Sequence, residues 1–96
     1  MNELKLVSKH PGSIRALVES AIMGSLREIE QGIQRTQQRL QNFETQYQMS
    51  TEEFVRRYEN DELIETFELG EWIGEYRMLK GLQEDATQLR GIEFVA

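Results

Sequence analysis

The stretch IMGSLREIEQGIQRTQQRLQNFETQY, residues 22–47, decides the fold. Its apolar residues recur at steps of three, four and seven, which is the spacing of one apolar stripe on a helix that packs against another helix. Thr36 stands at the intermediate position inside the step of seven. We call this stripe the seam, and we expect it to be an oligomer contact. Its members are Ile22, Leu26, Ile29, Ile33, Leu40, Phe43 and Tyr47.

The seam predicts one long helix from about residue 14 to about residue 49. His10-Pro11-Gly12 stops any earlier element, and Ser13 follows as an N-cap. Residues 1–12 are therefore expected to be an N-terminal arm, and residues 13–96 a single domain. Gly24 and Gly32 interrupt the helix. They are either tolerated surface glycines, the interpretation we favour, or points where a second helix backbone comes close.

The second half predicts two further helices. Ser50-Thr51-Glu52-Glu53 has the pattern of a capping box, in which Ser50 caps the helix and Glu53 reaches back to it. The short helix that follows ends before Asn60-Asp61. A last helix spans about residues 67–90, and Gly91 ends it. Its apolar stripe consists of Leu69, Trp72, Ile73, Tyr76, Leu79, Leu82, Ala86 and Leu89, and the tail after it is expected to fold back or to touch a neighbour.

Together these elements predict an all-α protein. The long helix and the last helix form an antiparallel hairpin with the short capped helix between them. Only 39% of the 96 residues are hydrophobic, so each stripe has to be covered by another helix. We expect two hairpins to complete a dimeric bundle.

Composition limits the classes of function. The net charge is −6, and it is uneven: residues 1–48 carry six bases and five acids, whereas residues 49–96 carry five bases and twelve acids. The acidic half makes nucleic acid an unlikely partner and suits a basic protein. The absence of cysteine excludes disulfides and thiolate metal sites. We see neither a signal peptide nor a run long enough to span a membrane, which predicts a cytoplasmic protein with no membrane contact.

Chemistry for catalysis is sparse, and we predict that the chain is not an enzyme. His10 lies in the arm, without an orienting partner. Glu68, Glu71 and Glu75 share one helix face but alternate with the apolar stripe, so we expect all three to point away from it into solvent. We predict no catalytic, metal-binding or cofactor-binding residue. A magnesium-dependent helical nucleotide hydrolase is retained as a third, unfavoured alternative.

Several short motifs carry a family resemblance: YQMSTEEF at residues 47–54, RYE at 57–59, DEL at 61–63, EW at 71–72 and GEY at 74–76. The chain thereby resembles small prokaryotic helical proteins that are often encoded beside a toxin gene and act as its antitoxin. Leu63-Ile64 departs from the more acidic, glycine-bearing linker of that family.

The resemblance implies a non-enzymatic module that neutralises a basic toxin by occluding its surface. The leading alternative is a structural coiled-coil homo-oligomer or scaffold subunit. Four aromatic side chains are candidate anchors for the partner, and the three acids of the last helix are candidate contacts to its bases. These residues are Phe54, Tyr58, Trp72 and Tyr76, with Glu68, Glu71 and Glu75.

Overall fold

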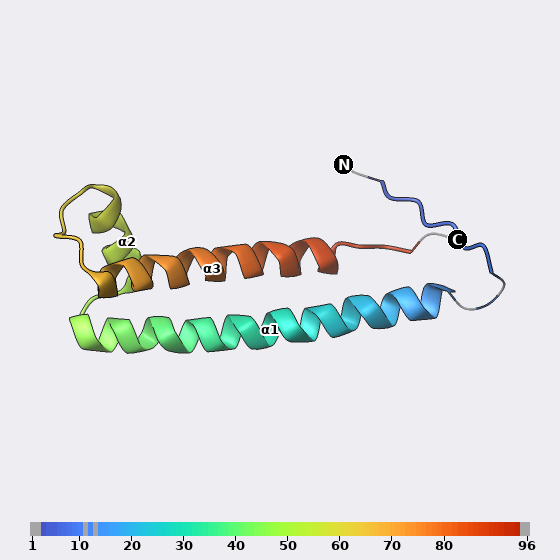
Figure 1. Cartoon of the computed structure of the whole chain (residues 1–96), viewed down its shortest axis with the longest axis horizontal. Coiled ribbons are helices and arrows are strands. Elements are labelled where there is room, and N and C mark those ends of the chain that lie inside the picture. Colours follow the sequence, from blue (N-terminus) through green and yellow to red (C-terminus); the bar gives the residue numbers. More distant parts are fainter. Residues whose placement is uncertain (1–2, 11, 13, 95–96) are drawn as a thin grey trace.

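The protein is a helical hairpin. A computed structural model describes residues 3–10, 12 and 14–94, and these residues contain three helices and no strand: α1 (Ile14–Tyr47), α2 (Thr51–Glu59) and α3 (Phe67–Arg90). α1 and α3 run antiparallel and side by side, and α2, which connects them in the chain, packs at the closed end of the hairpin (Figure 1). The molecule measures 60 × 25 × 18 Å. This confirms the predicted all-α hairpin.

The seam packs against α3 of the same chain. Leu40 is buried in the core, and Phe43 and Tyr47 pack against that core together with Trp72. The remaining seam residues are half-buried, and Thr36 is buried with its hydroxyl donating to the Gly32 carbonyl at 2.8 Å. The apolar stripe that we expected in an oligomer thus closes the hairpin within one chain.

Three cross-helix contacts define the register of α1 on α3. Gly32 lies beside Leu82, Arg39 beside Glu75, and Gln46 beside Glu68. These pairs step evenly along both helices, so the end of α3 lies level with Gly24. The first ten residues of α1, 14–23, therefore have none of the described helices opposite them.

The two glycines of α1 have different surroundings. A Cβ on Gly32 would lie 3.2 Å from Leu82 Cδ1, whereas a Cβ on Gly24 would meet nothing within 4 Å. The favoured interpretation, tolerated surface glycine, therefore describes Gly24 only. At Gly32 α3 does approach closely, although a leucine side chain and not the backbone makes the contact.

α2 begins with half of the predicted capping box. Ser50 Oγ accepts from the Glu53 N–H at 3.1 Å, as expected of an N-cap. Glu53 does not reach back to Ser50, because its carboxylate bonds Arg56 and Arg57 instead. These hydrogen bonds, first that from Arg57 and then that from Arg56, lower the pKa of Glu53. The N–H of Thr51 donates to Glu44 Oε2 of α1 at 2.7 Å, which ties the start of α2 to the long helix.

α3 begins and ends where the sequence predicts, at residues 67 and 90. Thr66 caps the helix by accepting from the Leu69 N–H at 3.2 Å. The helix ends at Gly91 as predicted, but Gly91 has a right-handed φ of −82° and not the left-handed one of a typical terminal glycine.

The two terminal segments lie at the open end of the hairpin (Figure 1). Residues 3–10 are exposed, and Ser13, the predicted cap of α1, lies outside the described residues. The tail after α3 continues in the direction of that helix and passes the start of α1, where the Arg15 guanidinium lies 5.1 Å from the centre of the Phe94 ring (Figure 1). None of the described helices is long and apolar enough to cross a membrane.

Candidate protein-binding surface

Trp72 is the centre of the packing between the three helices. Its ring stacks on Phe54 of α2 with centroids 3.9 Å apart and 5° between the planes. Phe43 and Tyr47 of α1 each lie 5.4 Å from it. The indole Nε1–H donates to Thr51 Oγ1 at 3.1 Å. One side chain of α3 thus holds both α1 and α2.

This packing changes the role of two predicted anchors. Phe54 and Trp72 are fully buried, so no surface of either ring is available to a partner. The anchor hypothesis is therefore wrong for these two residues in this conformation. Their size and position at the junction of three helices make them core residues, since large aromatic side chains contribute the most burial.

The other two aromatic candidates are partly exposed. The Tyr58 hydroxyl donates to Glu65 Oε1 at 2.8 Å, and its ring tilts against Phe54. This hydrogen bond to a carboxylate is the main reason that the pKa of Tyr58 is raised. Tyr76 is half-buried, with Lys80 Nζ 5.4 Å from the centre of its ring. Both rings keep an edge at the surface.

The three acids of α3 do not share one environment. Glu68 accepts from the Tyr47 hydroxyl and from Gln46 Nε2, and the bond to Glu68 is the main cause of a raised pKa at Tyr47. Glu75 pairs with Arg39 of α1 at 3.2 Å, and its Oε2 is buried without a hydrogen-bond partner among the described residues. Glu71 is exposed and, among the described residues, makes neither an ion pair nor a side-chain hydrogen bond.

The prediction that all three acids point into solvent is therefore wrong for Glu75, which is half-buried. Glu68 is exposed as predicted, but both Glu68 and Glu75 bond to side chains of α1. They lie four residues before and three residues after Trp72, so the helical repeat turns them toward the α1 side of α3. Their carboxylates border the apolar contact and meet polar groups of the long helix. They stabilise the hairpin, and their charge is less available to a partner than that of Glu71.

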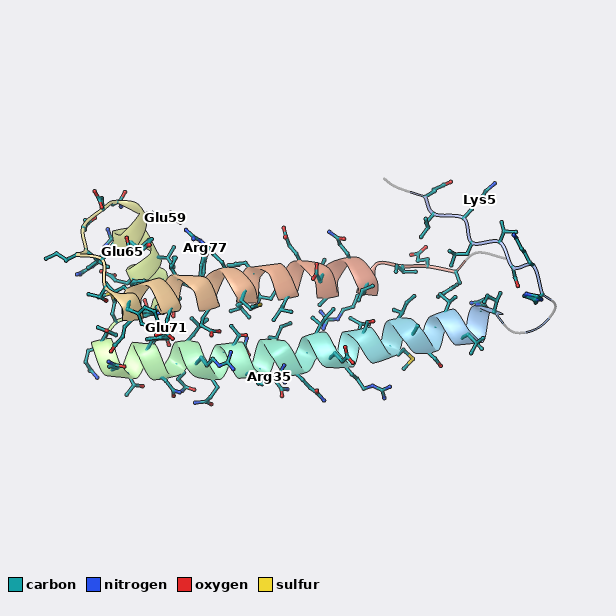
Figure 2. All side chains as sticks on the ribbon, viewed as in Figure 1. Lys5, Arg35, Glu59, Glu65, Glu71 and Arg77 are labelled. Atoms are coloured by element: carbon teal, nitrogen blue, oxygen red, sulfur yellow. The ribbon has the colours of Figure 1, made fainter. Side chains whose placement is uncertain are left out.

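The segment between α2 and α3 is the most acidic surface of the molecule. Residues 59–68, which we call the acidic loop, contain five acids and no base. Ile64 lies in the middle of this loop and is 88% exposed. Figure 2 shows the labelled Glu59 and Glu65 at the closed end of the hairpin, in the part of the chain formed by α2 and this loop.

Hydrogen bonds within the chain fix the shape of the acidic loop. Asp61 has a left-handed φ of 57°, and its N–H donates to the Tyr58 carbonyl at 3.2 Å. The Glu62 N–H donates to the Arg57 carbonyl at 2.9 Å, and Tyr58 holds Glu65 from the side. The loop thereby presents Ile64 outward in a defined position. The sequence contained one signal of this surface, the run of acids around an isolated Leu-Ile pair, which we read only as a departure from the family linker.

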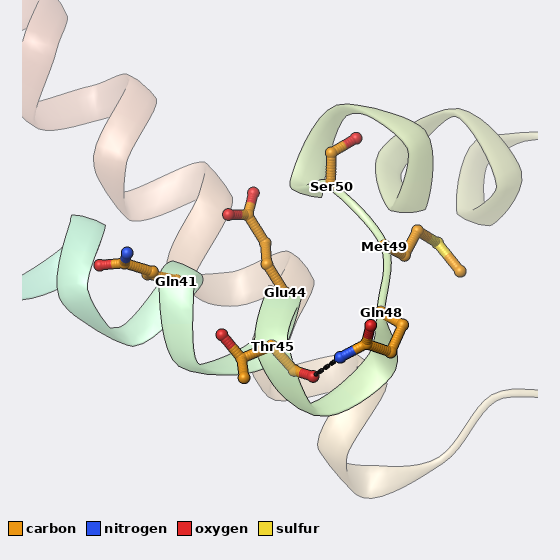
Figure 3. Close-up of a pocket in the computed structure, with 6 residues that line it drawn as sticks. All are labelled: Gln41, Glu44, Thr45, Gln48, Met49 and Ser50. Carbon is orange, nitrogen blue, oxygen red and sulfur yellow. Dashed lines mark hydrogen bonds between the residues drawn. The ribbon is translucent and has the colours of Figure 1, made fainter.

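A shallow depression lies beside the turn between α1 and α2 (Figure 3). The Gln48 side-chain amide donates to the Thr45 carbonyl at 2.7 Å within it, and Gln48 itself has a left-handed φ of 54°. Its six lining residues are Gln41, Glu44, Thr45, Gln48, Met49 and Ser50. Over the described ranges, no group of three or more histidine, cysteine or acidic side chains is arranged to hold a metal ion. The depression offers polar contacts but no grouping that suggests chemistry.

Comparisons of the chain with protein-family models, with curated proteins and with solved structures give no match.

Proposed function

We propose that this chain is a non-enzymatic protein-binding module that acts as the antitoxin of a toxin–antitoxin pair, and that it binds a basic partner through the acidic loop. The observation that carries the proposal is the exposed Ile64 surrounded by carboxylates within residues 59–68. Exposed apolar side chains inside a charged rim are typical of protein interfaces. The family resemblance of residues 47–84 supplies the kind of partner, a small toxin with a basic surface.

Charge is the main reason to expect a basic partner. Five carboxylates within ten residues create a strong local negative potential, which speeds the encounter with a positive surface and disfavours acidic partners. Two of the nearby bases are already engaged: Arg56 pairs with Glu53 and Glu62, and Arg57 pairs with Glu53. The carboxylate of Glu59 has no ion pair among the described residues and is exposed, so it is free to meet a base of the partner.

Occlusion would follow from size and shape. The hairpin is a rod with the acidic loop at its closed end, so a partner that binds there meets α2, the loop and the first turn of α3 together. A toxin that uses a basic surface to reach nucleic acid would lose access to it when that surface is covered. No reaction is required of the antitoxin for this effect.

The experiment is co-purification of the untagged neighbouring-gene product with this protein, with the complex mass read by light scattering. A stable stoichiometric complex supports the proposal. The double variant Glu59→Lys/Ile64→Asp should weaken binding by at least about tenfold, or roughly 1.4 kcal/mol. Glu28→Lys with Met23→Asp is the matched control, because it makes the same changes of charge on exposed positions of α1 away from the loop.

Two outcomes would contradict the proposal. The first is a purified neighbouring protein that does not bind. The second is equal loss of binding in the loop variant and the control, which would place the contact elsewhere.

A structural homo-oligomer is the second candidate function, and the observation that favours it is an exposed face of α3 bearing Phe67 and Met78.

A further inference from the structure

One face of α3 is exposed along most of the helix although it carries large apolar side chains. The residues of this face recur at alternating steps of four and three along α3, so they form one line along the helix surface, which we call the column. Phe67 is 84% exposed and Met78 is 58% exposed. None of the buried residues of α3 belongs to the column, whose members are Phe67, Glu71, Gly74, Met78, Gly81 and Asp85, all of them exposed.

Glycines lie between and beside these large side chains. A Cβ on Gly70, Gly74 or Gly81 would meet nothing within 4 Å, so no contact within the described residues requires a glycine there. Each interior glycine disfavours a helix by about 1 kcal/mol relative to alanine. Gly32 of α1 differs, because Leu82 lies against it. The three glycines of α3 are explained if another molecule comes close to this face.

We propose that α3 of a second copy docks on this face in the antiparallel direction, with Gly74 of the two copies at the crossing point. The sequence of α3 is self-complementary about that residue. Phe67 and Gly81 are both seven residues from Gly74, and Gly70 and Met78 are both four residues from it. In the antiparallel pair each large apolar side chain of one copy therefore lies level with a glycine of the other.

Charge favours the same direction. Arg77 lies as far after Gly74 as Glu71 lies before it, so the antiparallel register places the acid of one copy level with a base of the other. A parallel pair would instead place Glu71 beside Glu71 and Phe67 beside Phe67. Like charges at one level oppose association, and two large side chains at one level leave the glycines without a partner.

The rest of the fold leaves room for this docking. α1 contacts α3 through Leu82 and Glu75, and α2 contacts it through Trp72. The column belongs to neither contact. Two hairpins joined along α3 would form the four-helix arrangement expected from the sequence, but through α3 and not through the seam. Because one helix pair buries less than the roughly 800 Å² per partner of a standard interface, we expect a dissociation constant in the micromolar range.

Sedimentation equilibrium of the full chain at rising concentration tests the association. The proposal predicts a mass that rises from monomer to dimer and stops there. Gly74→Gln should weaken the dimer at least about tenfold without lowering the midpoint of urea unfolding at low protein concentration, since glutamine is a better helix former than glycine. Gly24→Gln is the matched control on α1 and should leave the dimer unchanged. A chain that stays monomeric at about 1 mM, or a Gly74→Gln variant that associates like wild type, would overturn the proposal.

A spin label at the end of α3 tests the direction. The chain has no cysteine, so Gln88→Cys gives a single labelling site, exposed and outside the predicted contact. Residue 88 lies fourteen positions from Gly74, which at 1.5 Å per residue separates the two labels by about 40 Å in the antiparallel dimer. A separation of about 10–20 Å would show a parallel pair, and a mass that exceeds the dimer would show an open chain; either result refutes the proposal. Neither test involves the basic partner, so the dimer stands or fails separately from the proposed function.

Discussion

The hydrogen bond between Trp72 and Thr51 allows a sharp test of how α2 is held. Thr51→Val replaces the hydroxyl with a methyl group of similar shape and leaves the backbone bond from Thr51 to Glu44 in place. The indole N–H then remains buried without its acceptor, because Trp72 is fully buried and Thr51 is 7% exposed. An unsatisfied buried donor costs about 1–3 kcal/mol.

We therefore expect Thr51→Val to lower the free energy of unfolding by about 2 kcal/mol. For a chain near 100 residues, 1 kcal/mol corresponds to about 4–8 °C in Tm, so the expected loss is about 10 °C. Thermal and urea unfolding followed by circular dichroism measure both quantities. Thr87→Val is the control, since the exposed Thr87 hydroxyl donates only to the Gln83 carbonyl of its own helix; its effect should be small.

A double-mutant cycle with Trp72→Phe completes the test. In the Trp72→Phe background there is no indole N–H to leave unsatisfied, so the added cost of Thr51→Val should largely disappear. The reasoning is refuted if Thr51→Val costs no more than Thr87→Val. It is also refuted if Thr51→Val costs the same with and without the indole.

Two further predictions concern glycine packing and pH. Gly24→Ala should stabilise the fold by up to about 1 kcal/mol because its Cβ has open space, and Gly32→Ala should gain clearly less because Leu82 must move; equal gains in urea unfolding would contradict the close contact at Gly32. Hydrogen bonds from Arg57 and Arg56 lower the pKa of Glu53 below its ordinary value of 4.5. The charged carboxylate therefore stabilises α2 fully at pH values above 4.5, and this stability is lost as the pH falls through the lower pKa of the folded state. Glu53→Gln should therefore flatten the acid limb of the stability–pH curve, whereas Glu52→Gln, an exposed neighbour in the same turn, should not, and identical curves for the two variants would argue against the ion pairs.

The spacing of apolar residues in the sequence was enough to predict the helical hairpin. The spacing of the seam and of the last apolar stripe gave two long helices, and the turn signals at Ser50 and Asn60 bounded a short one between them. Both signals are local, because caps and stripes depend on residues within one or two helical turns. The spacing of apolar residues does not predict which helix covers each stripe. In the structure, α3 of the same chain covers most of the seam.

The candidate site was harder to predict because it depends on contacts between distant residues. From the sequence, the Glu53 carboxylate could accept a hydrogen bond from the Ser50 N–H or from two arginines. Only the structure shows that it accepts from Arg56 and Arg57. The local sequence does not show that Glu68 bonds to Tyr47 or that Glu75 pairs with Arg39, because both partners lie far away along the chain. The choice between an aromatic anchor and an aromatic core for Trp72 likewise depends on what surrounds the ring in three dimensions.

The position of Trp72 makes the chain its own optical probe. It is the single tryptophan of the sequence, and its ring is enclosed by residues of α1 on one side and by Phe54 of α2 on the other. If α2 separated while α1 and α3 stayed paired, the indole would lose Phe54 and meet water, and its emission would shift to longer wavelength with little loss of helix. Fluorescence and helix content recorded together can therefore separate local opening of the closed end from unfolding of the whole hairpin, without any added label.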